Sequence, residues 1–166
     1  MNMKQNFTAI LKSPVGYLGV RLEGQKLIGL KFLGRKKPSA DEATENNEDI
    51  TKSVNSALNI YFTDPYNVKQ PEIMLDGTKF QKKIWKVLSL IRPGKTRTYS
   101  DIARELKTSP RAVGNACRRN PVPIFIPCHR VVSTTGRGGF MGHTSGEPLA
   151  IKEWLLAHEQ KATAGE

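Results

Sequence analysis

Cys128 is the residue of this sequence best placed to act as a nucleophile. It stands in the run Ile126-Pro127-Cys128-His129-Arg130, after an apolar segment and directly before two basic side chains. Basic neighbours favour the thiolate form, which is a soft nucleophile suited to displacement at a saturated carbon. A lone cysteine is more often an inert, buried apolar residue. The local pattern therefore makes Cys128 a candidate reactive thiol, with the packing role as the simpler alternative.

His129 can serve Cys128 only if the chain turns between them. Neighbouring residues of a strand point to opposite faces, so a continued strand would separate the two side chains. Pro127 favours a break at this point. A bridging water is the other way to connect the imidazole and the thiol.

Arg111 is the second candidate. Ser109-Pro110 predicts a helix start, with the serine as N-cap and the proline at the first helical position. Arg111 then places a cation at the positive end of the helix dipole, at a cost of up to about 1 kcal/mol. A phosphate, or a gap in a base stack, explains such a cation better than an ordinary exposed helix does.

Small residues follow Arg111 on the same predicted helix, namely Ala112, Gly114 and Ala116. A glycine inside a helix costs roughly 1 kcal/mol. Close approach to another molecule therefore explains Gly114 better than packing, and a face of small residues lets a helix lie against DNA.

Positive charge is concentrated in the second half of the chain. The formal net charge is +11; residues 1–77 carry 10 Lys+Arg against 9 Asp+Glu, whereas residues 78–166 carry 16 against 6. A merely basic protein would spread its charge, but a module that binds a polyanion concentrates it. This distribution predicts two domains, a scaffold at 1–77 and a polyanion-binding domain at 78–166.

The scaffold domain is predicted to be a small sheet with one helix. Alternating apolar residues predict strands at 7–12, 17–22 and 26–33. Residues 34–48 lack apolar periodicity and are expected to form an exposed, mobile loop. Helical spacing from Ile50 to Tyr61 predicts a helix of about 14 residues packed on the sheet.

The second domain is predicted to contain a helix-turn-helix. A first helix follows Thr78, with an apolar stripe at Phe80, Ile84, Val87, Leu88 and Ile91. Thr98 and Asp101 form a capping pair for a second helix, and a third runs from Ser109 to about Arg119. Because Lys107-Thr108 joins the last two, the third helix takes the recognition position.

Three elements are predicted beyond the recognition helix. They are an apolar strand at 122–126, a glycine-rich, hairpin-like wing at 133–146 and an amphipathic helix at about 149–160.

Composition narrows the class of protein. No apolar run reaches the roughly 18 residues of a membrane span, and no signal-peptide core follows Met1. We expect a cytoplasmic protein. Cys117 and Cys128 are too few for a disulfide framework and lack metal-ligand spacing, so both are expected to be thiols and no metal site is expected.

Six segments of the second half occur in the order, and at close to the spacing, seen in O6-alkylguanine-DNA alkyltransferases (methylated-DNA–protein-cysteine methyltransferases), which this chain therefore resembles. The segments are 77–85, 98–103, 111–114, 120–121, 126–132 and 152–159. Pro-Cys-His-Arg combined with Arg-Ala-Val-Gly at this spacing is highly specific. The residues before 77 match the family only in size and strand pattern.

The resemblance implies an α/β (α+β) fold. Its N-terminal domain would be ribonuclease-H-like, a small antiparallel sheet with a helix, and its C-terminal domain a winged helix-turn-helix. The implied activity is transfer of an alkyl group, usually methyl, from O6-alkylguanine in double-stranded DNA to Cys128, with O4-alkylthymine as a further substrate.

The implied reaction is stoichiometric. The nucleotide would be flipped out, since O6 lies within the base stack. The inert thioether would inactivate the protein after one turnover. No cofactor is needed, and a monomer is expected.

The resemblance assigns roles to individual residues. Cys128 would accept the alkyl group, His129 would act through a water as general base, and Glu159 would orient His129. Asn120 would join the recognition helix to the active-site strand. Tyr99 would donate a hydrogen bond to guanine N3.

The remaining implied contacts concern DNA and the base. Arg111 would fill the space of the flipped nucleotide. The other DNA-contacting residues would be Thr98, Ser100, Ala112, Gly114, Arg118 and Arg130. The pocket for the base would be lined by Tyr99, Cys117, Val131 and Phe140.

The sequence departs from the family at three places. Phe140 stands where a tyrosine is usual, the segment 141–148 is longer, and Cys117 brings a second thiol. Two other functions stay open: a lesion sensor of the same fold without chemistry, and a winged-helix regulator in which Cys128 senses alkylation or oxidation. A sensor would lack the acceptor cysteine, and no effector domain is evident for a regulator.

Overall fold

The computed structural model describes residues 6–43 and 48–164, which fall into two compact units divided between Leu75 and Asp76. The division predicted after residue 77 lies two residues further along. Both units combine helices with strands, which confirms the mixed α/β class. Among the described helices, none has the length and apolar character that a membrane span requires.

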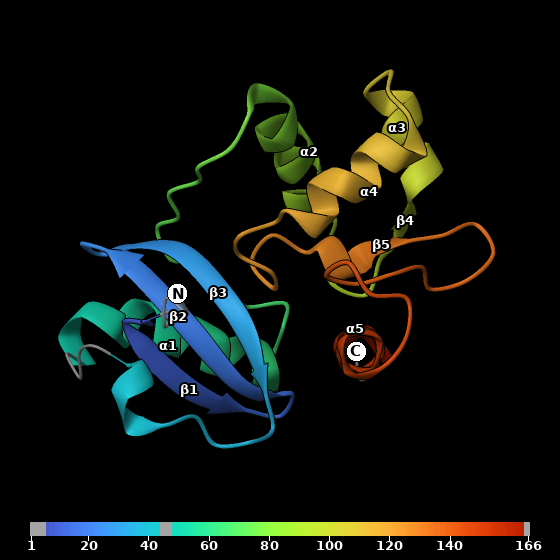
Figure 1. Ribbon diagram of the computed structural model, residues 1–166. Helices are drawn as coiled ribbons and strands as arrows, with labels where there is room; N and C mark the ends of the chain where they lie inside the picture. The colour runs from blue at the N-terminus through green and yellow to red at the C-terminus, as the bar shows by residue number, and fades with distance from the viewer. Residues whose placement is uncertain (1–5, 44–47, 165–166) are drawn as a thin grey trace. The chain divides into compact units, whose positions relative to one another are not determined.

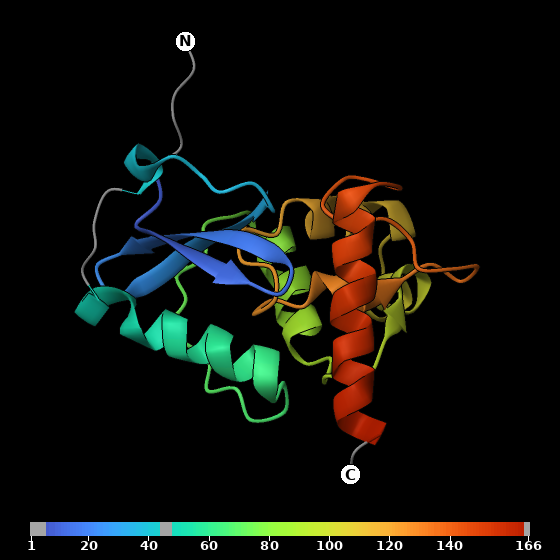
Figure 2. The ribbon, with the colours of Figure 1, turned by 90° about the horizontal axis from the view of Figure 1, so that it is seen from below.

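The first unit is an antiparallel three-stranded sheet with one helix along a face, as Figures 1 and 2 show. Its elements are β1 (Ala9–Ser13), β2 (Gly16–Glu23), β3 (Lys26–Gly34) and α1 (Glu48–Thr63). Leu18, Val20 and Leu27 have no exposed surface. Phe7 lies so close over β2 that a side chain at Gly19 would come within 2.6 Å of its ring.

The segment predicted as an exposed, mobile loop at 34–48 contains one short turn. Ala40–Glu42 form a 3-10 turn, and the Glu42 carboxylate accepts hydrogen bonds from the backbone and side chain of Ser39. The backbone N–H of Phe7 donates to the Glu42 carbonyl at 2.8 Å. The bonds within the turn and the bond to Phe7 hold this segment in place, although its sequence has no apolar periodicity. Residues 44–47 of the expected loop lie outside the described residues.

The second unit contains the remaining helices and two very short strands. They are α2 (Lys79–Ser89), β4 (Arg97–Thr98), α3 (Tyr99–Glu105), α4 (Pro110–Arg118), η2 (Cys128–Arg130), β5 (Val131–Val132) and α5 (Glu147–Ala164). The predicted N-caps Thr78, Thr98 and Ser109 are confirmed. Each side-chain oxygen accepts a backbone N–H three residues ahead, which satisfies a free donor of the first turn.

The predicted apolar stripe of α2 is partly wrong. Phe80 is exposed, whereas Trp85 is buried and its indole N–H donates to the Ala116 carbonyl at 2.9 Å. This bond connects α2 to α4. It satisfies the polar atom of a large aromatic residue that the sequence did not place in the core.

The strand predicted at 122–126 is absent, and this prediction is wrong. Residues 122–126 form a buried turn in which the Ile126 N–H donates to the Val122 carbonyl at 3.0 Å. Ile124 has φ +76°, a conformation that a β-branched residue seldom adopts and that no strand contains. Burial explains the apolar composition that favoured a strand.

The expected hairpin-like wing is also not a regular hairpin. β5 pairs in parallel with β4, and only single bridges, Ser133 to Gly136 and Phe140 to His143, follow it. The second bridge closes a tight turn in which Met141 and Gly142 both have positive φ. The last helix begins at Glu147, two residues before the predicted start, and extends to Ala164.

Candidate active site around Cys128

Cys128 lies at the start of a 3-10 turn. Because the chain turns here, the side chains of Cys128 and His129 are not forced to opposite faces, as they would be in a strand. Pro127 has φ −82° and ψ 67°, and the Cys128 N–H donates to the Ile126 carbonyl at 2.8 Å, which together form an inverse γ-turn. His129 therefore does not follow Cys128 in a strand. The Cys128 side chain is 3% exposed and contributes to the wall of a cavity.

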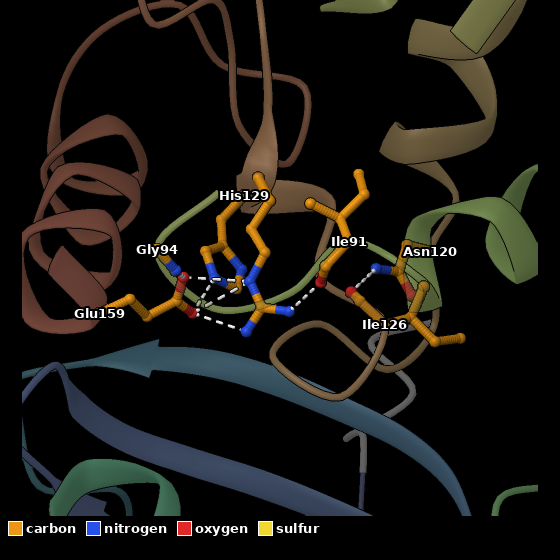
Figure 3. A network of polar contacts seen from close by, with 7 residues as sticks. Ile91, Gly94, Asn120, Ile126, His129 and Glu159 are labelled. Atoms are coloured by element: carbon orange, nitrogen blue, oxygen red, sulfur yellow. Dashed lines mark hydrogen bonds and ion pairs between the residues drawn. The ribbon is translucent and has the colours of Figure 1, made fainter. Parts of the chain in front are cut away.

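Asn120 fixes the loop that presents Cys128 (Figure 3). Its Nδ2 donates to the Ile126 carbonyl at 2.7 Å, and its Oδ1 accepts the Val122 N–H at 3.0 Å. Asn120 is buried, so both bonds form away from water. One side chain thus joins both ends of the turn that separates α4 from the cysteine.

Glu159 connects α5 to the 3-10 turn. Figure 3 shows its carboxylate directed at His129, with Oε1 2.6 Å from Nε2. The Arg130 guanidinium donates to both carboxylate oxygens, with its Nε 3.0 Å from Oε2 and its Nη2 2.9 Å from Oε1. The Nη1 of Arg130 donates to the Ile91 carbonyl at 2.5 Å. The side chains of His129, Arg130 and Glu159 are all buried.

This network sets the protonation of His129. Burial lowers its pKa and outweighs the opposing charge of Glu159, so the imidazole is neutral at neutral pH. Burial alone would raise the pKa of Glu159, but the hydrogen bonds from His129 and Arg130 and the charge of Arg130 hold it well below its usual range. An ionised carboxylate only accepts, so Nε2 carries the hydrogen. Nδ1, which is buried and has no hydrogen-bond partner, is the basic nitrogen.

The resting thiol of Cys128 is protonated. Burial raises its pKa to about 11, against the opposing effects of a hydrogen bond from Asn120 and the charge of Lys152. The reactive thiolate therefore requires a base, and the unpaired Nδ1 of His129 is chemically suited to that role.

A cavity of about 220 Å³ opens beside Cys128. The predicted residues Tyr99, Cys117 and Phe140 line it, together with Gly114 and Arg118 of α4. The Tyr99 hydroxyl lies 3.5 Å from the Gly139 carbonyl, and burial raises its pKa, so the phenol keeps its proton and acts as a donor. Burial likewise raises the pKa of the Cys117 thiol, which makes it a poor nucleophile.

The longer segment after Phe140 forms one wall of this cavity. Its residues in the wall are Met141, Gly142, His143 and Thr144. A side chain at Gly142 would come within 2.9 Å of Arg118 Nε, so the arginine of α4 lies against the turn. Ser145 is exposed and is not among the lining residues.

Arg130, predicted to contact DNA, and Val131, predicted to line the pocket, are both buried and bonded to other residues instead. Arg130 is 7% exposed and its guanidinium is committed to Glu159 and Ile91, so the prediction that it contacts DNA is wrong. Val131 does not line the cavity, contrary to prediction, because its side chain is fully buried and its carbonyl accepts a hydrogen bond from Lys152.

Four of the other predicted DNA contacts lie on α4, where Ala112 and Gly114 are half-buried, and two lie at the start of α3. Arg111 is the second helical residue, as predicted, and both it and Arg118 are exposed. A side chain at Gly114 would meet nothing closer than Tyr99 at 4.0 Å, so packing within the unit does not require a glycine there. Thr98 and Ser100 are half-buried at the start of α3, and the Thr98 hydroxyl caps that helix.

The sequence reasoning missed Lys152. It has no exposed surface, and its ammonium donates to the Val131 carbonyl at 2.7 Å and the Gly139 carbonyl at 2.8 Å. A signal was present, since Lys152 and Glu159 lie seven residues apart and share one face of α5 with the buried Leu155 and Leu156. Charged residues at core positions of a helix mark a site. Across residues 6–43 and 48–164, no three His, Cys, Asp or Glu side chains are grouped to hold a metal ion.

The comparisons with known proteins agree with this geometry. The family described as 6-O-methylguanine DNA methyltransferase, DNA binding domain, matches residues 79–161. A methylated-DNA–protein-cysteine methyltransferase of Methanosarcina acetivorans is 35% identical over 92% of this chain and 97% of its own. The human protein of that name is 37% identical over 90% of this chain and 78% of its own.

Solved structures extend the similarity to the fold. The O6-methylguanine methyltransferase of Mycobacterium tuberculosis superposes with a TM-score of 0.77 at 32% identity, covering 92% of each chain. A Mycobacterium tuberculosis structure in complex with DNA superposes with a TM-score of 0.76, also at 32% identity and 92% coverage of each chain. The matched family model, the relatives and the solved structures are all DNA alkyltransferases. The chain belongs to the methylated-DNA–protein-cysteine methyltransferase family.

Proposed function

We propose that this protein repairs O6-alkylguanine in double-stranded DNA by moving the alkyl group to Cys128. The observation that carries the proposal is a cysteine in the wall of a base-sized cavity, beside a buried His129–Glu159 pair and next to the exposed face of α4. The names of the relatives support the same reaction.

The mechanism follows from the protonation states. His129 accepts the thiol proton at Nδ1 through a water, and Glu159 stabilises the imidazolium that forms. The Cys128 thiolate attacks the alkyl carbon, the S–C bond forms and the C–O6 bond breaks. The electron pair of the broken bond stays on guanine, to which Tyr99 donates a hydrogen bond at N3. The proton taken from Cys128 finally passes from the His129 imidazolium to the guanine anion, so guanine leaves neutral. The thioether does not hydrolyse, so each molecule acts once.

DNA engagement uses the exposed face of α4. Arg111 enters the helix and occupies the space of the flipped nucleotide, while Ala112 and Gly114 allow close approach. Most of the affinity comes from phosphate contacts of the basic unit, so binding is salt-sensitive with little sequence preference. The protein acts as a monomer, in the cytoplasm, where the sequence leads us to expect it. O4-alkylthymine fits the same chemistry as a second substrate.

Mass spectrometry tests the proposal. The protein is incubated with a duplex that holds one O6-methylguanine and then cleaved with trypsin, which separates the Cys128 peptide (120–130) from the Cys117 peptide (112–118). We expect one methyl group on 120–130 and an equal loss of lesion. Repaired DNA with an unmodified 120–130 peptide would overturn the proposal.

The variant Cys128→Ala separates chemistry from binding. It should bind the lesion duplex with nearly unchanged affinity and leave the lesion intact. If the native protein also leaves the lesion intact while binding it, a sensor function replaces the one proposed.

A further inference from the structure

Lys152 is a buried cation for which the described residues offer no carboxylate. It has no exposed surface, and none of the ion pairs formed by residues 6–43 and 48–164 includes it. Glu159, on the same face of α5, is already shared by His129 and Arg130. Buried charges in proteins are normally balanced by an opposite charge, because removal from water is otherwise costly.

The two bonds of Lys152 fix its ammonium beside the reaction site. One acceptor, the Val131 carbonyl, follows the turn that holds Cys128; the other, the Gly139 carbonyl, belongs to the cavity wall. The same Gly139 carbonyl faces the Tyr99 hydroxyl, and the ammonium lies 6.0 Å from the centre of the Tyr99 ring. Carbonyl dipoles solvate the ammonium but do not neutralise it.

We propose that Lys152 is a positioning residue whose buried ammonium stabilises the thiolate of Cys128 and, by bridging Val131 and Gly139, holds the cavity wall against the cysteine. When the thiol proton passes to His129, a negative charge appears on sulfur, and Lys152 is the cation that this charge lacks. The inference deepens the proposed function, on which it rests, by naming what stabilises the attacking group.

Other titratable groups of this unit are less suited to this task. They are His129 and Arg130 on the same turn, Glu159 on α5, Tyr99 on α3, Cys117 and Arg118 on α4, and Arg137 and His143 on the segment after β5. The charge of Arg130 is compensated by Glu159, and Arg118, Arg137 and His143 are exposed to water. Lys152 alone in this group is a cation with neither solvent nor a carboxylate.

The pH dependence of cysteine alkylation gives the test a signature that a structural role lacks. Burial lowers the pKa of Lys152 to about 8, against the opposing charges of Cys128 and Cys117. The ammonium is therefore present below about pH 8 and lost above it. Lys152→Met should slow the reaction below that pH and have little effect above it, whereas Lys152→Arg keeps a charge throughout.

The experiment measures the rate of Cys128 alkylation by iodoacetamide from pH 6 to 10, read on the 120–130 peptide. A shift of one pKa unit should lower the rate about threefold to fourfold rather than tenfold, since a more basic thiolate is also more nucleophilic. Below pH 8 we expect the native protein to react about threefold to fourfold faster than Lys152→Met. Above pH 9 we expect the two rates to become equal. Lys152→Arg should match the native protein below pH 8. Lys161→Met, which removes an exposed charge from the same helix, should change nothing.

The proposal would be overturned if native protein and Lys152→Met react at equal rates, or if their rates differ by the same factor at every pH. If Lys152→Met fails to fold, Lys152→Arg alone is compared with the native protein from pH 6 to 10. We expect equal rates below pH 8 and a faster reaction of Lys152→Arg above it, where the native lysine has lost its charge and the arginine has not; equal rates at every pH would overturn the proposal. Neither measurement needs DNA, so each can succeed or fail independently of the repair reaction.

Discussion

The Glu159 carboxylate lies 2.6 Å from His129 Nε2, across 30 residues of sequence, and neither side chain has any exposed surface. This pair leaves Nδ1 as the basic nitrogen of the ring. It also places a full negative charge in the interior, where Arg130 compensates it. Stability and reactivity therefore depend on the same three side chains.

Replacing Glu159 by Gln should reduce both the stability of the protein and the reactivity of Cys128. The amide keeps the shape but leaves the Arg130 charge buried without compensation, and breaking such a pair costs about 3–5 kcal/mol. Urea unfolding measures the loss. Glu153→Gln, at an exposed position of the same helix, is the matched control and should change the free energy of unfolding by less than about 0.5 kcal/mol. Equal effects of the two variants would contradict the structural role of Glu159.

Acidification should destabilise the protein in two steps. Folding lowers the pKa values of both His129 and Glu159. Below the pKa that each residue has in the unfolded chain, the unfolded state therefore binds more protons than the folded state, and the protein loses stability as the pH falls. Stability is complete above about pH 6.5, falls as His129 must be protonated on unfolding, and falls again below about pH 4.3 through Glu159. Urea unfolding between pH 2 and 8 measures both steps. His129→Gln should remove the first step and keep the second; a first step that persists in this variant would assign it to another group.

Arg130→Met should destabilise the fold without altering DNA recognition. Loss of the guanidinium leaves Glu159 and the Ile91 carbonyl without their main donor, at a cost of about 3–5 kcal/mol. The salt dependence of DNA binding should not change. Arg118→Met should do the reverse, with stability nearly unchanged and the salt slope reduced by about 1. A reduced slope in Arg130→Met would instead support the original prediction that Arg130 contacts DNA.

Gly114→Ala should separate stability from DNA affinity. An alanine fits, with 4.0 Å to its nearest neighbour, and gains up to about 1 kcal/mol of helix propensity. If α4 lies against DNA at this residue, the added methyl group weakens binding while the protein becomes more stable. Thermal unfolding and fluorescence anisotropy with a labelled duplex measure the two effects. Unchanged affinity would contradict close approach at Gly114.

The features that the sequence predicted well are those decided over a few residues. Thr78, Thr98 and Ser109 cap helices because each hydroxyl bonds a backbone N–H three residues away. The turn at 122–126 escaped prediction because its conformation depends on Asn120 and on a positive φ at Ile124, while its composition is that of a buried strand. Family resemblance, rather than local pattern, pointed to Glu159.

The burial of Lys152 and Arg130, in contrast to the helix caps, could not be predicted from a few neighbouring residues. A lysine or arginine is usually at the surface, and only contacts formed in the folded chain bury these two. The carbonyls that hold Lys152 come 21 and 13 residues earlier in the chain. Partners at such separations follow from the packing of α5, which no local pattern encodes.

The bond between Trp85 and Ala116 gives the protein a built-in optical probe. The chain has two tryptophans: Trp85, fully packed with its indole bonded to α4, and Trp154, half-buried on α5 and stacked on His158. Ala116 immediately precedes Cys117 in the cavity wall. In a Trp154→Phe background, the emission of the single remaining fluorophore would report in real time whether α4 keeps its place as Cys128 becomes a thioether.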